Sequence, residues 1–248
     1  DTIKITGATS GAAFTMGEGK DSVEITGKGA GVFKMGAGND TLKAATFEGT
    51  LYLGAGDDGF TLTDKATEST FQSASGNNTF ALDDADTITI SAGTGNDKVT
   101  AAAALTYATI EVGAGKDTIQ LSNKLEESTV KLGDGNDTIA FGVTGTTNEN
   151  STIYGGSGDD SITSDGLVKS STISDANGAT KVVLLDGAEK ATVSTGGSAD
   201  KIYLTEDASA EGAADSFLGT AGIDAILIQN QQTPSFTSGR QSNDIITV

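Results

Sequence analysis

The motif Gly-x-Gly-x-Asp recurs about every twenty residues along most of this chain, and no other feature constrains the fold as strongly. Its seven clear copies end at Asp21, Asp40, Asp58, Asp97, Asp117, Asp137 and Asp160. A fixed period of a few tens of residues indicates a repeat array, because one unit alone cannot bury its apolar face and must stack on its neighbours. The sequence therefore predicts a solenoid.

Short segments with alternating apolar residues flank each glycine turn. Residues 118–121 and 138–141 follow a turn, and residues 128–132 precede one. A period of two predicts half-buried strands, so each repeat carries two strands joined by a variable polar segment such as 122–127. We expect an all-β, right-handed parallel β-solenoid of about thirteen flattened two-strand coils of roughly 20 residues. It forms one continuous domain over residues 1–248, with the strongest repeats over 17–162 and more degenerate coils over 163–248.

The amino-acid composition limits the kinds of ligand, partner and reaction that the chain can support. The chain has no Cys, His or Trp and a formal net charge of -19, which excludes thiol chemistry and imidazole ligation and argues against a nucleic-acid partner. No apolar run approaches the roughly 18 residues needed to span a bilayer. The chain begins at Asp1 without Met or a signal peptide, in the middle of a repeat, which we interpret as a processed product or a fragment.

Stacking places the repeated aspartates in a column. At a coil spacing of about 4.8 Å, each neighbouring pair of carboxylates repels by roughly 0.9 kcal/mol in water and about 3.5 kcal/mol at an effective dielectric constant of 20. An isolated copy is adequately explained as a tight turn with an Asp cap, but a column of charges opposes its own folding. Carboxylates and convergent turn carbonyls suit Ca²⁺ better than octahedral Mg²⁺. The repetition therefore favours several bound calcium ions.

The motif resembles the GGxGxDxUx nonapeptide of RTX (hemolysin-type calcium-binding) repeat proteins, over nearly the whole chain. The fullest match is 155–162, whereas an apolar residue replaces the first glycine at Leu53, Val112 and Leu132. The resemblance implies a parallel β-roll in which turn carbonyls and Asp side chains of adjacent coils share Ca²⁺. It nominates as metal ligands the side chains of Asp21, Asp40, Asp58, Asp97, Asp117, Asp137 and Asp160 with the turns of Gly17, Gly19, Gly36, Gly38, Gly54, Gly56, Gly93, Gly95, Gly113, Gly115, Gly133, Gly135, Gly156 and Gly158.

The chain departs from that family in ways that set expectations. The motif lies on one edge of the coil only, so we expect one row of ions. The degenerate turn ending at Asn78 interrupts the row, which leaves two ladders, over 17–58 and 93–160, with roughly five shared sites. The turns at 177–180 and 221–224 are weak, and that ending at Asp200 is intermediate. Lys20 and Lys116, beside the key aspartates, would lower affinity if they reach the site.

We expect no enzyme, because the chain lacks His and Cys and its carboxylates follow a structural period. The acidic groups at 83–86, 126–127 and 206–207 are interpreted as solvated charge, and the longer insertions at 142–150 and 205–214 as length variation on the variable edge. The ending 244–248 resembles the acidic-then-apolar terminus of type I secretion substrates and also fits a last strand.

The sequence thus favours a secreted structural protein of the bacterial cell surface that folds with calcium and self-assembles into a surface layer, with a cell-surface glycan as a further possible partner. One alternative is the repeat region of an RTX adhesin, protease, lipase or toxin whose active domain lies upstream. Another is a solenoid without calcium that serves as a carbohydrate-binding or spike module.

Overall fold

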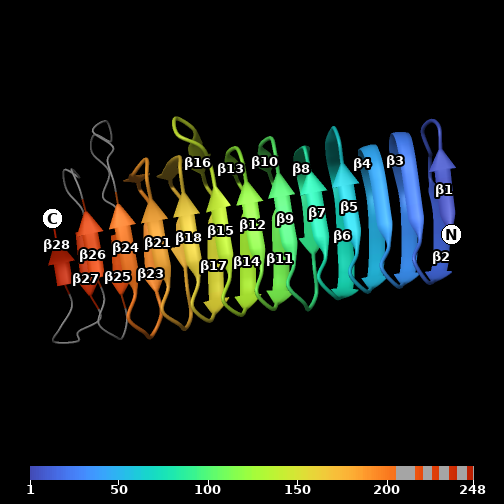
Figure 1. Ribbon diagram of the computed structural model, residues 1–248. Coiled ribbons are helices and arrows are strands. Elements are labelled where there is room, and N and C mark those ends of the chain that lie inside the picture. Colours follow the sequence, from blue (N-terminus) through green and yellow to red (C-terminus); the bar gives the residue numbers. More distant parts are fainter. Residues whose placement is uncertain (205–215, 220–224, 229–234, 239–244, 248) are drawn as a thin grey trace.

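The computed structural model is a stack of parallel β-coils, drawn from the blue N-terminal end to the red C-terminal end in Figure 1. It describes residues 1–204, 216–219, 225–228, 235–238 and 245–247. The predicted all-β parallel solenoid is confirmed. About ten coils are described in full, rather than thirteen, and the strands after Thr195 continue the same pairing.

Two rows of parallel strands run the length of the stack. The row that follows the glycine turns consists of β1 (Thr2–Ile5), the first parts of β3 (Ser22–Ala37) and β4 (Thr41–Ala55), β5 (Gly59–Leu62), β7 (Thr79–Leu82), β9 (Lys98–Ala101), β12 (Thr118–Leu121), β15 (Thr138–Phe141), β18 (Ser161–Ser164), β21 (Lys181–Leu184), β24 (Lys201–Leu204), β26 (Ala225–Ile228) and β28 (Ile245–Thr247). The row that leads into them consists of β2 (Ala12–Glu18), the last parts of β3 and β4, β6 (Lys65–Ser75), β8 (Asp84–Ser91), β11 (Thr109–Ala114), β14 (Thr129–Asp134), β17 (Thr152–Ser157), β20 (Thr172–Ser174), β23 (Thr192–Thr195), β25 (Ser216–Gly219) and β27 (Ser235–Ser238). Each strand pairs with its equivalent in the adjacent coils, as Ile119 of β12 does with Val99 and Ile139.

The expected two-strand coil is wrong in one respect, because a third, short strand lies in the variable segment. These strands are β10 (Leu105–Thr106), β13 (Leu125–Glu126), β16 (Thr147–Glu149), β19 (Leu167–Lys169) and β22 (Ala188–Glu189). They pair along the stack as well, for example Leu105 with Leu125. The segment treated as irregular is therefore part of the repeat.

The chain turns after this third strand through a backbone conformation that recurs from coil to coil, although the residue type at the turn differs. The residue at the corner has a positive φ of 47° to 55° in seven coils, at Glu68, Thr87, Tyr107, Glu127, Asn150, Ser170 and Lys190. Such a conformation costs a non-glycine residue about 1–2 kcal/mol. Because glycine does not mark this corner, the sequence pattern did not reveal it.

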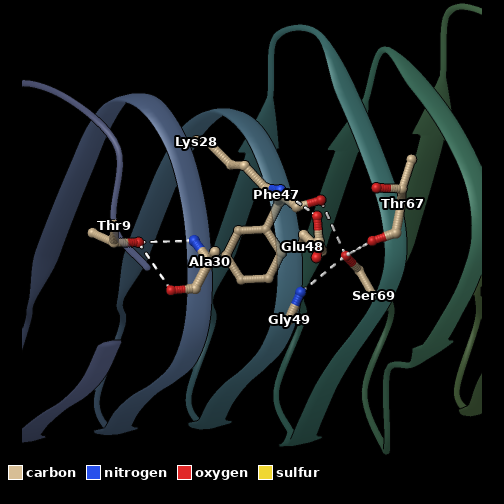
Figure 2. A network of polar contacts seen from close by, with 8 residues as sticks. All are labelled: Thr9, Lys28, Ala30, Phe47, Glu48, Gly49, Thr67 and Ser69. Carbon is tan, nitrogen blue, oxygen red and sulfur yellow. Dashed lines mark hydrogen bonds and ion pairs between the residues drawn. The ribbon is translucent and has the colours of Figure 1, made fainter. Parts of the chain in front are cut away.

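Hydroxyl groups satisfy the backbone at this edge, which is the upper edge in Figure 1. Figure 2 shows Ser69, whose Oγ donates to the carbonyl of Thr67 at 2.8 Å and accepts from the N–H of Gly49 at 3.3 Å. Thr9, three coils earlier, satisfies a backbone group of the following coil, since its Oγ1 accepts from the N–H of Ala30 at 2.8 Å. Buried backbone groups need such partners, since an unpaired one costs free energy.

Inward-facing side chains of both strand rows fill the interior. A run of phenylalanines packs the N-terminal coils, with ring centroids 4.5 Å apart for Phe60 and Phe71 and 5.4 Å apart for Phe47 and Phe71. Later coils use Ile, Val and Leu at the same positions, such as Ile110 and Val130. Burial of this apolar surface drives the stacking, as the repeat predicted.

The glycine turns lie on the opposite edge and stack directly on each other. Gly135 has a φ of +140°, and a Cβ added there would lie 1.5 Å from the carbonyl oxygen of Gly115. No side chain fits between turns that approach this closely. The glycines are thus required by the stacking as well as by the turn, and they hold the following Asp in register.

Candidate metal centre

The aspartate that ends each glycine turn faces the interior. All seven predicted side-chain ligands are at most 3% exposed: Asp21, Asp40, Asp58, Asp97, Asp117, Asp137 and Asp160. Asn78, Thr180 and Asp200, each 1% exposed, occupy the equivalent position in their coils. Carboxylates are rarely buried without partners, so this column needs a source of compensation.

One oxygen of each carboxylate belongs to a ladder between coils. The N–H of Asp97 donates to Oδ1 of Asp117 at 2.6 Å, and the N–H of Asp117 donates to Oδ1 of Asp137 at 2.7 Å. The same bond links Asp21 to Asp40, Asp40 to Asp58, and Asp137 to Asp160 at 2.8 Å each. Each aspartate therefore fixes the turn of the coil before it.

The other oxygen has no hydrogen-bond partner. Oδ2 is buried and unpaired in Asp40, Asp58, Asp97, Asp117, Asp137 and Asp160. Leaving a buried charged oxygen without a partner costs several kcal/mol, which is on the order of the whole stability of many domains. A regular row of such atoms is a set of oxygen acceptors available to protons or to a cation.

The pKa values of these groups follow from that environment. Burial, opposed by the backbone hydrogen bond and reinforced by the neighbouring carboxylate, raises the pKa of Asp58, Asp117 and Asp137 to about 6. Burial also raises the pKa of Asp40 and Asp97. Without a cation, the column thus retains protons that free aspartates lose.

The contacts of Asn78 indicate which groups surround the unpaired oxygen of the aspartates in the other coils. It keeps its place in the ladder, accepting from the N–H of Asp58 at 3.1 Å and donating its own N–H to Asp97 at 2.7 Å. Its Nδ2, which replaces the second carboxylate oxygen, donates to the carbonyls of Gly76 at 2.9 Å and Ala92 at 3.2 Å. The hydrogen-bond ladder is therefore not interrupted at this degenerate turn.

By register, the same two carbonyls flank each aspartate. Around Asp117 they belong to Gly115 of its own turn and Leu132 of the next coil, the positions that correspond to Gly76 and Ala92. A carboxylate oxygen repels these carbonyls unless a positive group stands between them. The donor set of carboxylate and carbonyl oxygens fits a hard cation such as Ca²⁺.

Backbone groups dominate this donor set. Within the part of the chain that the structure describes, no three acidic side chains come together as a metal cluster. Of the predicted glycine ligands, Gly19, Gly38, Gly56, Gly95, Gly115, Gly135 and Gly158 hold the turn position of Gly76, whose carbonyl faces the site. The first glycines of the motif lie at the end of the incoming strand. The carbonyls of Gly17, Gly36, Gly93, Gly113 and Gly133 closely approach the stacked glycine of the next coil. The carbonyl of Gly54 accepts from Oγ of Ser73 at 3.1 Å, and that of Gly156 accepts from the N–H of Ala176 at 3.1 Å.

A second, exposed row of Asx side chains runs along the outside of the same turns. The N–H of Asn96 donates to Oδ1 of Asn77 at 2.8 Å, and the N–H of Lys116 donates to Oδ1 of Asn96 at 2.7 Å. This row runs in the opposite sense to the buried ladder and was missed in the sequence. Lys116 donates to this row, and Lys20 holds the equivalent position in its turn; both side chains are exposed.

The described acidic groups that were interpreted as solvated charge do not join the buried column. The 83–86 and 126–127 groups lie at the opposite edge, where Lys65 pairs with Asp84 at 3.3 Å and Lys124 pairs with Glu126. Residues 142–150 form part of that edge, including β16. The predicted features at 205–214, Asp224 and Asp244 lie outside the described residues. Among those described, no helix is long and apolar enough to cross a bilayer.

Comparison with known proteins supports the fold. No family model and no curated protein matches the chain. The fold is similar to the crystal structure of a hyperactive, Ca²⁺-dependent, β-helical antifreeze protein from an Antarctic bacterium, with a TM-score of 0.72 and 20% sequence identity over 94% of this chain and 74% of that one. At this identity the similarity establishes a parallel β-solenoid fold.

Proposed function

We propose that this chain is a structural β-solenoid whose folded state is stabilised by calcium bound along the aspartate column, as in RTX-type repeats. The row of buried, unpaired Oδ2 atoms carries the proposal. Asn78 supports it, because the only described coil with Asn in the column puts an N–H donor where the others have an acceptor. The Ca²⁺ dependence of the structurally similar antifreeze protein is consistent with it.

In this account the ion contributes its binding free energy to folding. Bound Ca²⁺ would be held by the buried Asp and the turn carbonyls of two adjacent coils, and it supplies positive charge where the coils otherwise repel each other. The aspartates also orient the turns through their Oδ1 ladder. In a calcium-poor compartment the folded state is less stable, and it gains stability after export, since calcium binds to the folded state alone.

Replacement of Asp117 with Asn tests this role. Asn keeps the Oδ1 acceptor for Asp97 and supplies an Nδ2 donor as Asn78 does. We expect the variant to bind fewer ions than the wild type in calorimetric titration and to unfold at a higher temperature in EGTA. Glu111→Gln removes one exposed charge from the outer face and is the control. Equal calcium binding by both variants and the wild type would contradict the proposal.

We further propose that the protein is secreted and self-assembles into a bacterial surface layer. Support comes from the elongated stack and from the formal net charge of -19. Electron microscopy of the purified chain should show ordered arrays with calcium and none in EGTA. Single separate rods under both conditions would favour the alternative of a repeat region attached to an adhesin or an exported enzyme.

We propose that a groove lined by glycines binds a cell-surface glycan and so anchors the protein. It has a volume of about 530 Å³ and runs over Gly93, Gly113, Gly133 and Gly156, flanked by polar side chains and by the exposed Tyr154. An aromatic face beside hydrogen-bonding groups suits a sugar chain. Loss of binding to purified cell-wall glycan in Tyr154→Ala, with no change in Tyr107→Ala at the opposite edge, is the expected result.

A specific surface feature favours ice binding as a second candidate. Eight threonines lie in register on the outer face of one strand row: Thr50, Thr70, Thr89, Thr109, Thr129, Thr152, Thr172 and Thr192. Their hydroxyl and methyl groups repeat at the coil spacing of about 4.8 Å, which gives a regular array toward water. The structurally similar protein is described as an antifreeze protein.

Thermal hysteresis measured on the calcium-loaded chain separates the two candidates. Ice binding through this column predicts a freezing-point depression that Thr109→Tyr, on the exposed part of the column, reduces strongly. Thr118→Tyr, on the exposed face of the other strand row, is the matched control. Absence of hysteresis in the wild type removes this candidate and leaves the structural role in place.

A further inference from the structure

Two successive coils depart from the apolar interior at one inward position. The inward position just before the glycine turn holds Val112 and Leu132 in two successive coils, and then Gly155 and Asp175 in the next two. The carboxylate of Asp175 therefore lies in the interior at the end of the incoming strand, whereas the aspartates of the column lie at the end of each glycine turn. Asp175 is 7% exposed and was not among the residues that the repeat pattern nominated.

The side chain of Asp175 meets the aspartate column at Asp160. A Cβ added at Gly155 would lie 2.4 Å from Oδ1 of Asp175 and 2.9 Å from Oδ2 of Asp160, so both oxygens border the space that this glycine leaves open. Those two atoms are buried and have no hydrogen-bond partner. Two carboxyl groups that face one cleared space and contact each other repel when both are charged, unless a proton or a cation is shared between them.

The surroundings hold Asp175 in this position. Its Oδ2 accepts a hydrogen bond from Oγ1 of Thr180 at 2.6 Å. Thr180 occupies the column position where other coils have Asp, so its coil has exchanged the carboxylate of the column for one on the incoming strand. Burial, with the carboxyl of Asp175 among the smaller causes, raises the pKa of Asp160 to about 7.

We infer that Asp160 and Asp175 form a two-carboxylate site for a divalent cation, with Gly155 providing its space, and that this site binds calcium more tightly than the single-aspartate sites of the column. This inference rests on the proposed calcium-dependent function. Calcium affinity rises with the number of charged ligands, and here the two carboxylates balance the charge of one Ca²⁺. The site lies at the end of the strong repeats and fills first as calcium rises.

Calorimetric titration of the full chain with Ca²⁺ tests the inference. The wild type should show one ion bound at least ten times more tightly than the rest. Asp175→Asn, which is close to isosteric, should lose that tight ion and retain the weaker ones. Asp159→Asn is the control, because Asp159 is exposed in the same turn and Asn preserves the Oδ1 acceptor for the N–H of Ala179.

Gly155→Ala provides a second variant with both carboxylates intact, and it decides the question if circular dichroism shows Asp175→Asn to be unfolded. Its methyl group occupies the proposed site and should also abolish the tight ion. A tight ion that persists in the folded variants overturns the inference and leaves the calcium-dependent function standing. A wild-type chain that binds no calcium overturns both.

Discussion

The side-chain Nδ2 of Asn78 donates to the carbonyl of Ala92 in the next coil at 3.2 Å, in the position where six other coils have an unpaired carboxylate oxygen. This single natural replacement identifies the atoms that surround each proposed ion. It also explains how the stack continues through a turn that has lost its aspartate. A neutral donor satisfies the same carbonyls locally, without an ion.

Restoring the aspartate at this position should create a calcium site. We expect Asn78→Asp to bind one ion more than the wild type in calorimetric titration. In EGTA the variant loses both Nδ2 hydrogen bonds and gains a buried charge, so its unfolding temperature should fall by on the order of 5 °C. Asn96→Asp adds the same charge on the exposed row and should do neither.

The stacked glycine turns predict a sharp contrast between two Gly→Ala variants. Gly135→Ala places a Cβ 1.5 Å from the carbonyl oxygen of Gly115 at a φ of +140°, and we expect destabilisation at the upper end of the usual range of about 0.5–3 kcal/mol. Gly59→Ala, whose Cβ would meet Thr41 at an ordinary 3.7 Å, should change the free energy of unfolding by less than about 1 kcal/mol. Denaturant unfolding compares them, and similar costs would argue against direct stacking of the turns.

The raised pKa values predict an unusual pH dependence in the absence of calcium. Because the pKa values of Asp58, Asp117 and Asp137 rise from 3.8 to about 6 on folding, the folded state binds more protons than the unfolded chain between about pH 4 and 6. Stability in EGTA should therefore increase as the pH falls from 8 to 5 and decrease as the pH rises through 6.

The stabilisation that calcium provides should have the opposite pH dependence. Protons compete with the ion for the same carboxylates, so the increase in unfolding temperature that calcium produces should shrink between pH 7.5 and 5. Thermal scans across this range, with and without calcium, give both curves. A stability in EGTA that does not change with pH would mean that the buried carboxylates are compensated in another way.

Much of this fold can be predicted from the sequence. The glycine turns, the register of the strands at residues such as Ile119, and the inward direction of the aspartates all follow from a repeat whose residue types are constrained by sterics and burial. The corner at Glu127 could not be predicted. Its positive φ recurs with different residue types, so the constraint is on the backbone and leaves no fixed letter in the sequence.

The candidate site is predictable to a similar extent. Its repeated carboxylates stand out, but the role of Asn78 as an internal donor depends on carbonyls that only the fold brings together. Asp175 was missed because it lies five residues before the column position and follows no period. The signal that points to it is the replacement of an inward apolar residue by Gly155 in the preceding coil.

Thermal unfolding of the whole chain at pH 7.5, over free calcium concentrations set with a chelator, tests the central claim most directly. The account predicts that the unfolding temperature rises steadily with the logarithm of free calcium, since each ion binds the folded state alone. An unfolding temperature in EGTA equal to that in millimolar calcium would contradict it.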